Sequence, residues 1–235
     1  MNLQSVRQWS VSASASAALM LLSGCSFFFQ VDATKESFYQ IPDVSLPQAA
    51  NHCWARLSVK DARAGGFIQT RKIVFSSDPI EQGYYQFASW TEPPTKRFTT
   101  VLISALDGTR YYPSVLHITS ASDGDLQLNT EILSFYHNTS KNPGTFESKM
   151  RFELLDMRSR APAEGVTIVK TIPVESFDSE GAVKAASEAV QQTIVDLNQW
   201  LEQRCSKEPP TVHDSRRPNT ASFDPANDGF EETGE

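Results

Sequence analysis

Residues 146–154 alternate strictly between two kinds of side chain, and this pattern constrains the fold more than any other feature of the chain. One set is apolar apart from a single serine, and consists of Phe146, Ser148, Met150, Phe152 and Leu154. The positions between them are all charged. A period of two residues is typical of a β-strand with one face buried and the other in water. The chain must therefore build a sheet whose buried face is covered by a second layer.

Further patterns predict the rest of that sheet and its covering layer. Strands are expected at residues 53–59, 67–75, 83–90, 115–118, 126–136 and 166–172, which are rich in aromatic and β-branched residues. Apolar side chains at helical spacing predict one helix from Pro93 to Asp107-Gly108 and a second over residues 179–204. The expected fold is α+β: a two-layer sandwich in which two main helices pack on one face of a mixed sheet.

The first 24 residues have the pattern of an export signal. An uncharged apolar run from Val11 to Leu22 is too short to cross a bilayer, which takes about 20 apolar residues. It ends in the residues Leu22, Ser23, Gly24 and Cys25, which match a bacterial lipobox. The thiol of Cys25 is then acylated and the chain is cut before it. A plain signal peptide with an incidental cysteine is the alternative.

The remaining chain divides into three parts. Residues 25–51 are expected to be a lipidated N-terminus and tether, residues 52–205 the folded domain, and residues 206–235 a disordered acidic tail. Without the signal peptide, which carries Arg7 as its one charged side chain, the net charge of -7 becomes -8. An acidic chain makes nucleic acid an unsuitable partner.

Two cysteines lie at opposite ends of the expected domain. Cys53 opens the first expected strand and Cys205 closes the last helix, so a disulfide between them would tie the two ends together. Two free thiols are the alternative. No metal site is expected, because no histidine or cysteine lies at ligand spacing from either.

The chain shows no recognisable catalytic motif, and no cofactor is expected. His117, inside an expected strand, is interpreted as a hydrogen-bonded structural residue. A candidate interaction surface is formed by the aromatic residues Tyr84, Tyr85, Phe87 and Trp90. Alternation puts Tyr84 and Trp90 on one face and Tyr85 and Phe87 on the other. One of these faces is expected to pack under the helices and the other to be free for docking or lipid contact, although most of the rings could instead belong to the core.

The order of several short motifs resembles the ABC-type transport auxiliary lipoproteins, the relatives of paraquat-inducible protein C. Residues 39–42 (YQIP) are similar to a motif near the mature N-terminus of that family. The residues from Arg71 to Phe75, then from Tyr84 to Trp90, and then Pro93 follow the family's order and spacing. The resemblance covers roughly residues 36–205. Phe75 and Phe87 replace the family's commoner tyrosines, and the acidic tail is an addition.

The resemblance implies a non-enzymatic role beside an inner-membrane ABC transporter and a periplasmic protein with mammalian-cell-entry domains. Such systems are linked to the movement of phospholipid or other lipids between the two membranes. The chain would be the lipid-anchored component on the periplasmic face of the outer membrane. Ser26, the residue after the anchor, allows this location, and the inner membrane is the alternative. A homo-oligomer is possible. The competing hypotheses are a structural or assembly lipoprotein with no part in lipid transport, and an enzyme with a cryptic site.

Overall fold

Three long antiparallel strands form one side of the sheet. They are β7 (Leu126–Asn138), β8 (Thr145–Asp156) and β9 (Glu164–Pro173), and β8 pairs with both of the others. The alternating residues of 146–154 lie in β8, and every member of the apolar set is buried. The prediction of a strand with one buried face is therefore confirmed.

The computed structural model describes residues 35–78, 80–118, 124–159 and 163–205. The predicted signal peptide, the lipobox around Cys25 and the predicted tail 206–235 lie outside these residues. The folded unit begins at Ser37. No helix in the described ranges is long and apolar enough to cross a membrane.

Shorter strands complete the sheet at both ends of β7. At one end β4 (Lys72–Asp78) runs parallel to β7 and forms a hairpin with β5 (Glu81–Trp90), and β1 (Ser37–Tyr39) adds to β5. At the other end β2 (Leu57–Val59) lies between β7 and β6 (Val115–His117). The two-residue strand β3 (Arg63–Ala64) pairs with the middle of β7. Within the described residues, the result is a mixed nine-stranded sheet.

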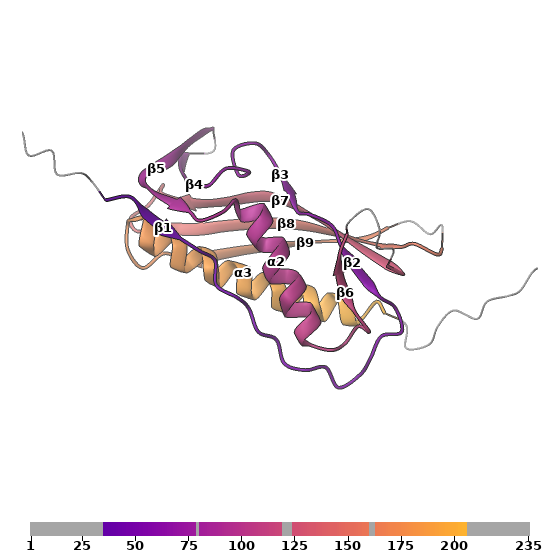
Figure 1. Cartoon of the computed structure of the whole chain (residues 1–235). Helices are drawn as coiled ribbons and strands as arrows, with labels where there is room; N and C mark the ends of the chain where they lie inside the picture. The colour runs from indigo at the N-terminus through magenta and orange to yellow at the C-terminus, as the bar shows by residue number, and fades with distance from the viewer. Residues whose placement is uncertain (1–34, 79, 119–123, 160–162, 206–235) are drawn as a thin grey trace, which may run out of the picture. The chain divides into compact units, whose positions relative to one another are not determined.

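Two helices form the second layer. Helix α2 (Pro94–Gly108) begins with proline in its first turn, and α3 (Ser179–Glu202) is capped by Asp178, whose carboxylate accepts a hydrogen bond from the Gly181 N–H. Both helices lie on the same side of the sheet (Figure 1), and their apolar stripes are buried against it. The predicted α+β sandwich is thus confirmed.

Two predicted strands are shorter in the structure. Of residues 53–59 only 57–59 form a strand, although Cys53 and Ala55 are buried on the same side as expected. Residues 67–71 form a turn instead of extending β4, because the Gly65 carbonyl accepts hydrogen bonds from the N–H groups of Ile68 and Gln69. The aromatic and β-branched composition of 67–75 did not reveal this turn.

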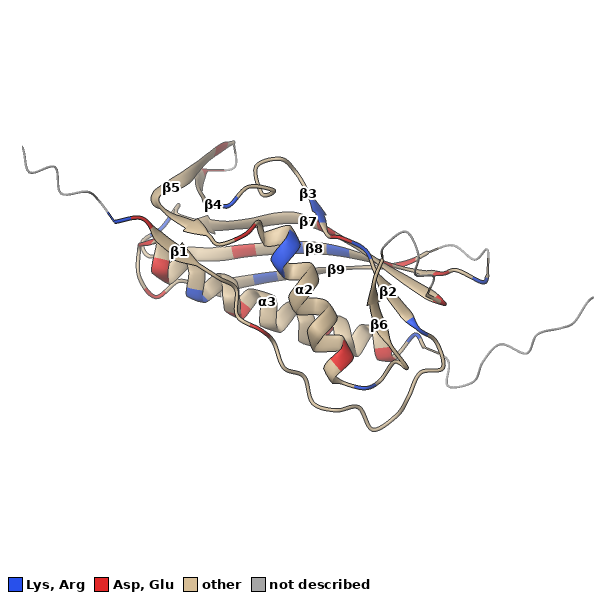
Figure 2. Cartoon of the chain, in the orientation of Figure 1, with Lys and Arg blue, Asp and Glu red and all other residues tan. Residues whose placement is uncertain are grey.

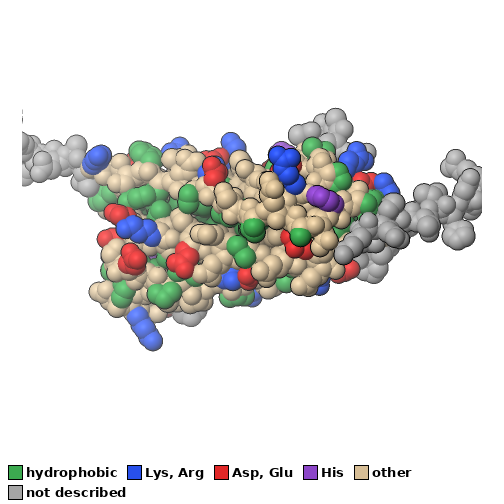
Figure 3. All heavy atoms as spheres, turned by 90° about the horizontal axis from the view of Figure 1, so that it is seen from below, with side chains coloured by type: hydrophobic (Ala, Val, Ile, Leu, Met, Phe, Trp, Pro, Cys, Tyr) green, Lys and Arg blue, Asp and Glu red, His purple; other side chains and the backbone are tan. Residues whose placement is uncertain are grey.

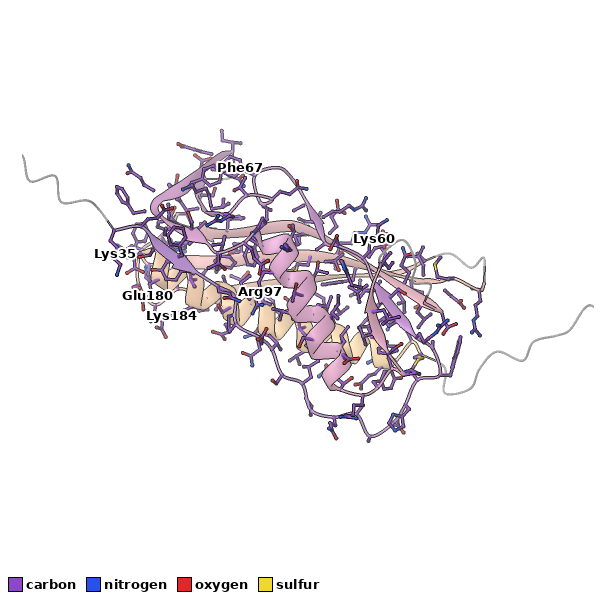
Figure 4. The ribbon with its side chains drawn as sticks, in the orientation of Figure 1. Lys35, Lys60, Phe67, Arg97, Glu180 and Lys184 are labelled. Carbon is purple, nitrogen blue, oxygen red and sulfur yellow. A yellow bond between two sulfur atoms is a disulfide. The ribbon has the colours of Figure 1, made fainter. Side chains whose placement is uncertain are left out.

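The segment 37–51 belongs to the folded unit rather than to a free tether. It contributes strand β1, and the side chains of Ile41 and Val44 are buried in the core. The guanidinium of Arg97, on α2, donates to the Ile41 carbonyl at 2.7 Å and to the Asp43 carboxylate at 2.9 Å. Arg97 is only 9% exposed and faces this segment (Figure 4). Any free tether therefore ends before Ser37, although the prolines at 42 and 47 suggested a longer one.

A disulfide joins Cys53 to Cys205, with the two Cα atoms 5.7 Å apart. Neighbouring hydrogen bonds hold the same two regions together: Cys53 N–H donates to the Tyr111 carbonyl, and Tyr111 Oη donates to the Glu202 carbonyl. The bond thus connects the segment before β2 to the end of α3, as the positions of the two cysteines suggested.

Candidate functional site

The four aromatic residues predicted as an interaction surface divide differently from the expected alternation. Trp90 is 3% exposed and packs against Phe135 in the core. Tyr85 also points inward and contacts Phe75. Tyr84 and Phe87 are 37% and 45% exposed. The prediction that Tyr84 and Trp90 share one face, and Tyr85 and Phe87 the other, is wrong.

An irregularity in the β4–β5 hairpin explains the difference. Tyr84 pairs with Val74, and Ser89 pairs with Lys72. The two pairs are therefore five residues apart along β5 but only two residues apart along β4. Extra residues in one strand of a ladder shift the side chains that follow them to the opposite face. Nothing in the composition of residues 81–90 marks the position of such a bulge.

The exposed rings form a surface that we call the aromatic patch, defined by Phe38, Phe67, Tyr84 and Phe87. The rings of Phe67 and Tyr84 stack with their centroids 4.3 Å apart. Phe38 on β1 is the neighbour of Ser89 on β5, two residues after Phe87. The Arg71 guanidinium lies 5.8 Å from the Phe38 ring centroid and comes from the same loop as Phe67. Figure 4 shows Phe67 beside the β4–β5 hairpin.

Beneath the hairpin, Tyr85 and His137 form a buried polar pair that the sequence did not predict. The His137 Nε2–H donates to the Pro143 carbonyl at 2.7 Å, so Nδ1 carries no proton and accepts from the Tyr85 hydroxyl at 2.7 Å. Phe177 packs edge-on against the imidazole. Burial lowers the pKa of His137, and burial together with the charge of Asp178 raises the pKa of Tyr85 to about 12. The sequence places His137 at the end of a strand, with no local signal of burial.

This pair predicts a pH dependence of stability. The folded state holds the His137 ring neutral, so the unfolded state takes up a proton more readily, and stability is lost as pH falls through about 6.5. We expect the free energy of unfolding of the native chain to fall between pH 7 and pH 5, as measured by urea unfolding. In His137→Gln this fall should be smaller. His52→Gln, at an exposed histidine, is the control and should keep the native fall; equal falls in all three chains would contradict the assignment.

Two open grooves flank the helices. One, of about 900 Å³, lies between residues 42–44 and α3, and the other, of about 700 Å³, lies between α2 and residues 61–69. The second contains the pair formed by His117 Nε2 and the Asp61 carboxylate, 2.7 Å apart, which agrees with a hydrogen-bonded His117. Both grooves mix charged and apolar side chains. The face seen from below likewise shows hydrophobic side chains in small groups between charged ones (Figure 3).

Over the part of the chain that the structure describes, charged side chains do not gather into a single region. Acidic and basic residues are interspersed over the strands and helices (Figure 2). Among the described residues, no group of three or more histidine, cysteine, aspartate or glutamate side chains could hold a metal ion.

A family model described as "ABC-type transport auxiliary lipoprotein component" matches residues 39–198, which is more than half of the chain. The chain belongs to this family. No curated protein matches the chain. The fold is similar to the crystal structure of a protein of the same family from Xanthomonas campestris, at 19% identity and a TM-score of 0.64, over 70% of this chain and 94% of that one. An uncharacterized protein is also similar, at 13% identity and a TM-score of 0.57, over 71% and 99%.

In this auxiliary lipoprotein, the motifs that suggested the family lie around the hairpin and the N-terminal segment. Residues 39–42 run from β1 into the segment that Arg97 holds. Arg71 pairs with the far end of the second motif, since its Nε–H donates to the Trp90 carbonyl and the Trp90 N–H donates to the Arg71 carbonyl. The family motifs therefore fix the hairpin that carries two of the four residues of the aromatic patch, Tyr84 and Phe87.

Proposed function

We propose that the mature auxiliary lipoprotein is held at the periplasmic face of the outer membrane by acyl groups on Cys25. There it acts without catalysis, as the docking component for an ABC transporter and a periplasmic protein with mammalian-cell-entry domains that together move lipid between the membranes. The observation that carries this proposal is the family match over residues 39–198, which begins 14 residues after the lipobox cysteine.

Two carboxyl groups with perturbed pKa values, Asp125 and Asp178, are engaged in holding the fold, and this supports a docking role. Asp125 accepts hydrogen bonds from Arg56 N–H and Nε–H and from Arg158. Burial alone would raise the pKa of this carboxyl, and these hydrogen bonds hold it below its ordinary value. The hydrogen bonds of the α3 N-terminus lower the pKa of Asp178 in the same way. Perturbed groups are candidates for catalysis when they converge in a cleft, and these do not line either groove.

The charged side chains of the larger groove also favour docking over the carriage of lipid in that groove. A lipid-carrying site needs a concave and largely apolar lining. The larger groove places Lys170, Lys184, Glu188 and Asp196 among its lining residues. Such a lining suits contact with a polar protein surface better than it suits an acyl chain.

Cross-linking in intact cells tests this function. An amine-reactive cross-linker applied to cells that carry the affinity-tagged chain should recover a protein with mammalian-cell-entry domains, identified by mass spectrometry. The matched control is Cys25→Ser, which removes the anchor. Its recovery of the partner should be strongly reduced, because anchoring in a shared compartment raises the effective concentration of the two proteins. Recovery of no such partner with cross-linkers of several lengths would favour a structural lipoprotein instead.

A further inference from the structure

The aromatic patch lies at the end of the domain where the chain enters the fold. Phe38 is the second residue of β1, and β1 is the first element of the folded unit. Phe38 is 55% exposed, and Tyr84 and Phe87 project from β5, the strand with which β1 pairs. The patch is thus built around β1, the strand nearest in the chain to Cys25, and around β5, which pairs with it.

The length of chain before β1 restricts how far the patch can lie from the anchor. Three phenylalanines, residues 27–29, follow Cys25 almost directly and suit the boundary between lipid headgroups and acyl chains. From Phe29 to Ser37 the chain takes eight steps. At roughly 3.3–3.6 Å per step, a fully extended chain spans at most about 29 Å. With residues 27–29 at the membrane, Ser37, the first residue of β1, therefore remains within about 30 Å of the membrane surface.

The chemistry of the patch suits a lipid interface. Exposed aromatic rings beside cationic side chains are typical of surfaces that lie at the headgroup level. Here Arg71 stacks over Phe38, and the Lys72 ammonium donates to Ser89 between the strands. Other exposed apolar side chains, such as Val169 on β9 and Met157 after β8, lie away from this hairpin in the sheet. Single exposed apolar residues need no partner, whereas a group of rings indicates a binding surface.

We propose that the aromatic patch lies against the headgroups of the same membrane that holds Cys25, so that the domain has a fixed orientation on the bilayer. This inference rests on the anchor in the proposed function. The contact is shallow, because Asp78 and Glu81 border the hairpin turn and the cost of burying carboxylates in the acyl region keeps that turn in water. The opposite end of the domain, where α3 ends at Glu202, is then left free for protein partners.

Site-directed spin labelling tests the contact on the full mature chain. Cys25 is acylated and Cys53 is bonded to Cys205, so a single introduced cysteine can be labelled selectively. Phe87→Cys places a nitroxide in the patch. Val169→Cys is the matched control, at an exposed apolar residue on β9 that is 57% exposed. The labelled chains are reconstituted in vesicles of phosphatidylethanolamine and phosphatidylglycerol, and power saturation measures collisions of each label with oxygen and with a water-soluble nickel chelate.

For each label we compare the ratio of its collisions with oxygen to its collisions with the nickel chelate. This ratio should be several-fold higher at Phe87→Cys than at Val169→Cys. Equal ratios at both sites, each typical of water, would overturn the proposal. Vesicle flotation and the mass of the Cys25 peptide, measured on the same samples, separate this failure from failure of the anchor. A chain that floats with acylated Cys25 but shows a water-exposed label at both sites retains the proposed function and loses only the orientation.

Discussion

Removal of the disulfide in the Cys53→Ala/Cys205→Ala chain should lower the free energy of unfolding by about 2–5 kcal/mol. The bond joins residues that are 152 positions apart, so it removes much of the freedom of the unfolded chain. The upper part of the range is the chain-entropy value for so long a loop, and the lower part allows for structure in the unfolded state. Urea unfolding at neutral pH, followed by circular dichroism, measures the change.

The native chain under reducing conditions is the matched control for this prediction. It keeps both cysteine side chains and loses only the bond, so it should unfold at nearly the same urea concentration as the double variant. If the oxidised native chain and the double variant unfolded at the same urea midpoint, the bond would not constrain the domain. In the oxidising periplasm of the proposed function, this bond would persist and help to retain the fold.

The Arg97→Met chain should lose about 2–3 kcal/mol of stability, because the substitution leaves the Ile41 carbonyl without its charged donor. That hydrogen bond, at 2.7 Å, lies between α2 and the N-terminal segment. The ion pair with Asp43 adds little, since the Asp43 side chain is 73% exposed. The measurement is again the free energy of unfolding in urea.

The neighbouring lysine provides the control. Lys96→Met makes the same kind of change one residue earlier on α2, but the Lys96 side chain is 73% exposed and its nearest carboxylate oxygen, on Glu92, is 3.7 Å away. We expect a loss below about 0.5 kcal/mol. Equal losses in Arg97→Met and Lys96→Met would mean that Arg97 does not hold the segment. If the account is correct, protease cleavage within residues 37–47 should also increase in Arg97→Met alone.

Regular periodicity allowed most of the fold to be predicted. Strand β8 and the two helices have uninterrupted patterns, because each buries one face against a single neighbouring layer along its whole length. The family order of motifs supported the two strands of the hairpin, β4 and β5, whereas residues 25–51 were predicted to be a tether. The disulfide between Cys53 and Cys205 was suggested only by their positions at the two ends of the domain.

Features that depend on tertiary contacts were not predictable in this way. The bulge in β5 is set by the pairing of Lys72 and Val74 with distant residues, and it moved Trp90 from the predicted surface into the core. Residues 37–51 resembled a linker because few of their side chains are buried. The contact that holds this segment comes from Arg97, more than 50 residues later in the chain. The burial of His137 depends on Tyr85 and Pro143, which no local pattern connects to it.

The central claim is that this domain acts by contact while it is fixed to a membrane through residue 25. Mass spectrometry of the mature N-terminal peptide from the membrane fraction tests it most directly. We expect a peptide that begins at Cys25 and carries a diacylglyceryl thioether and an amide-linked acyl chain. A chain with unmodified Cys25, recovered in the soluble periplasmic extract, would contradict the account.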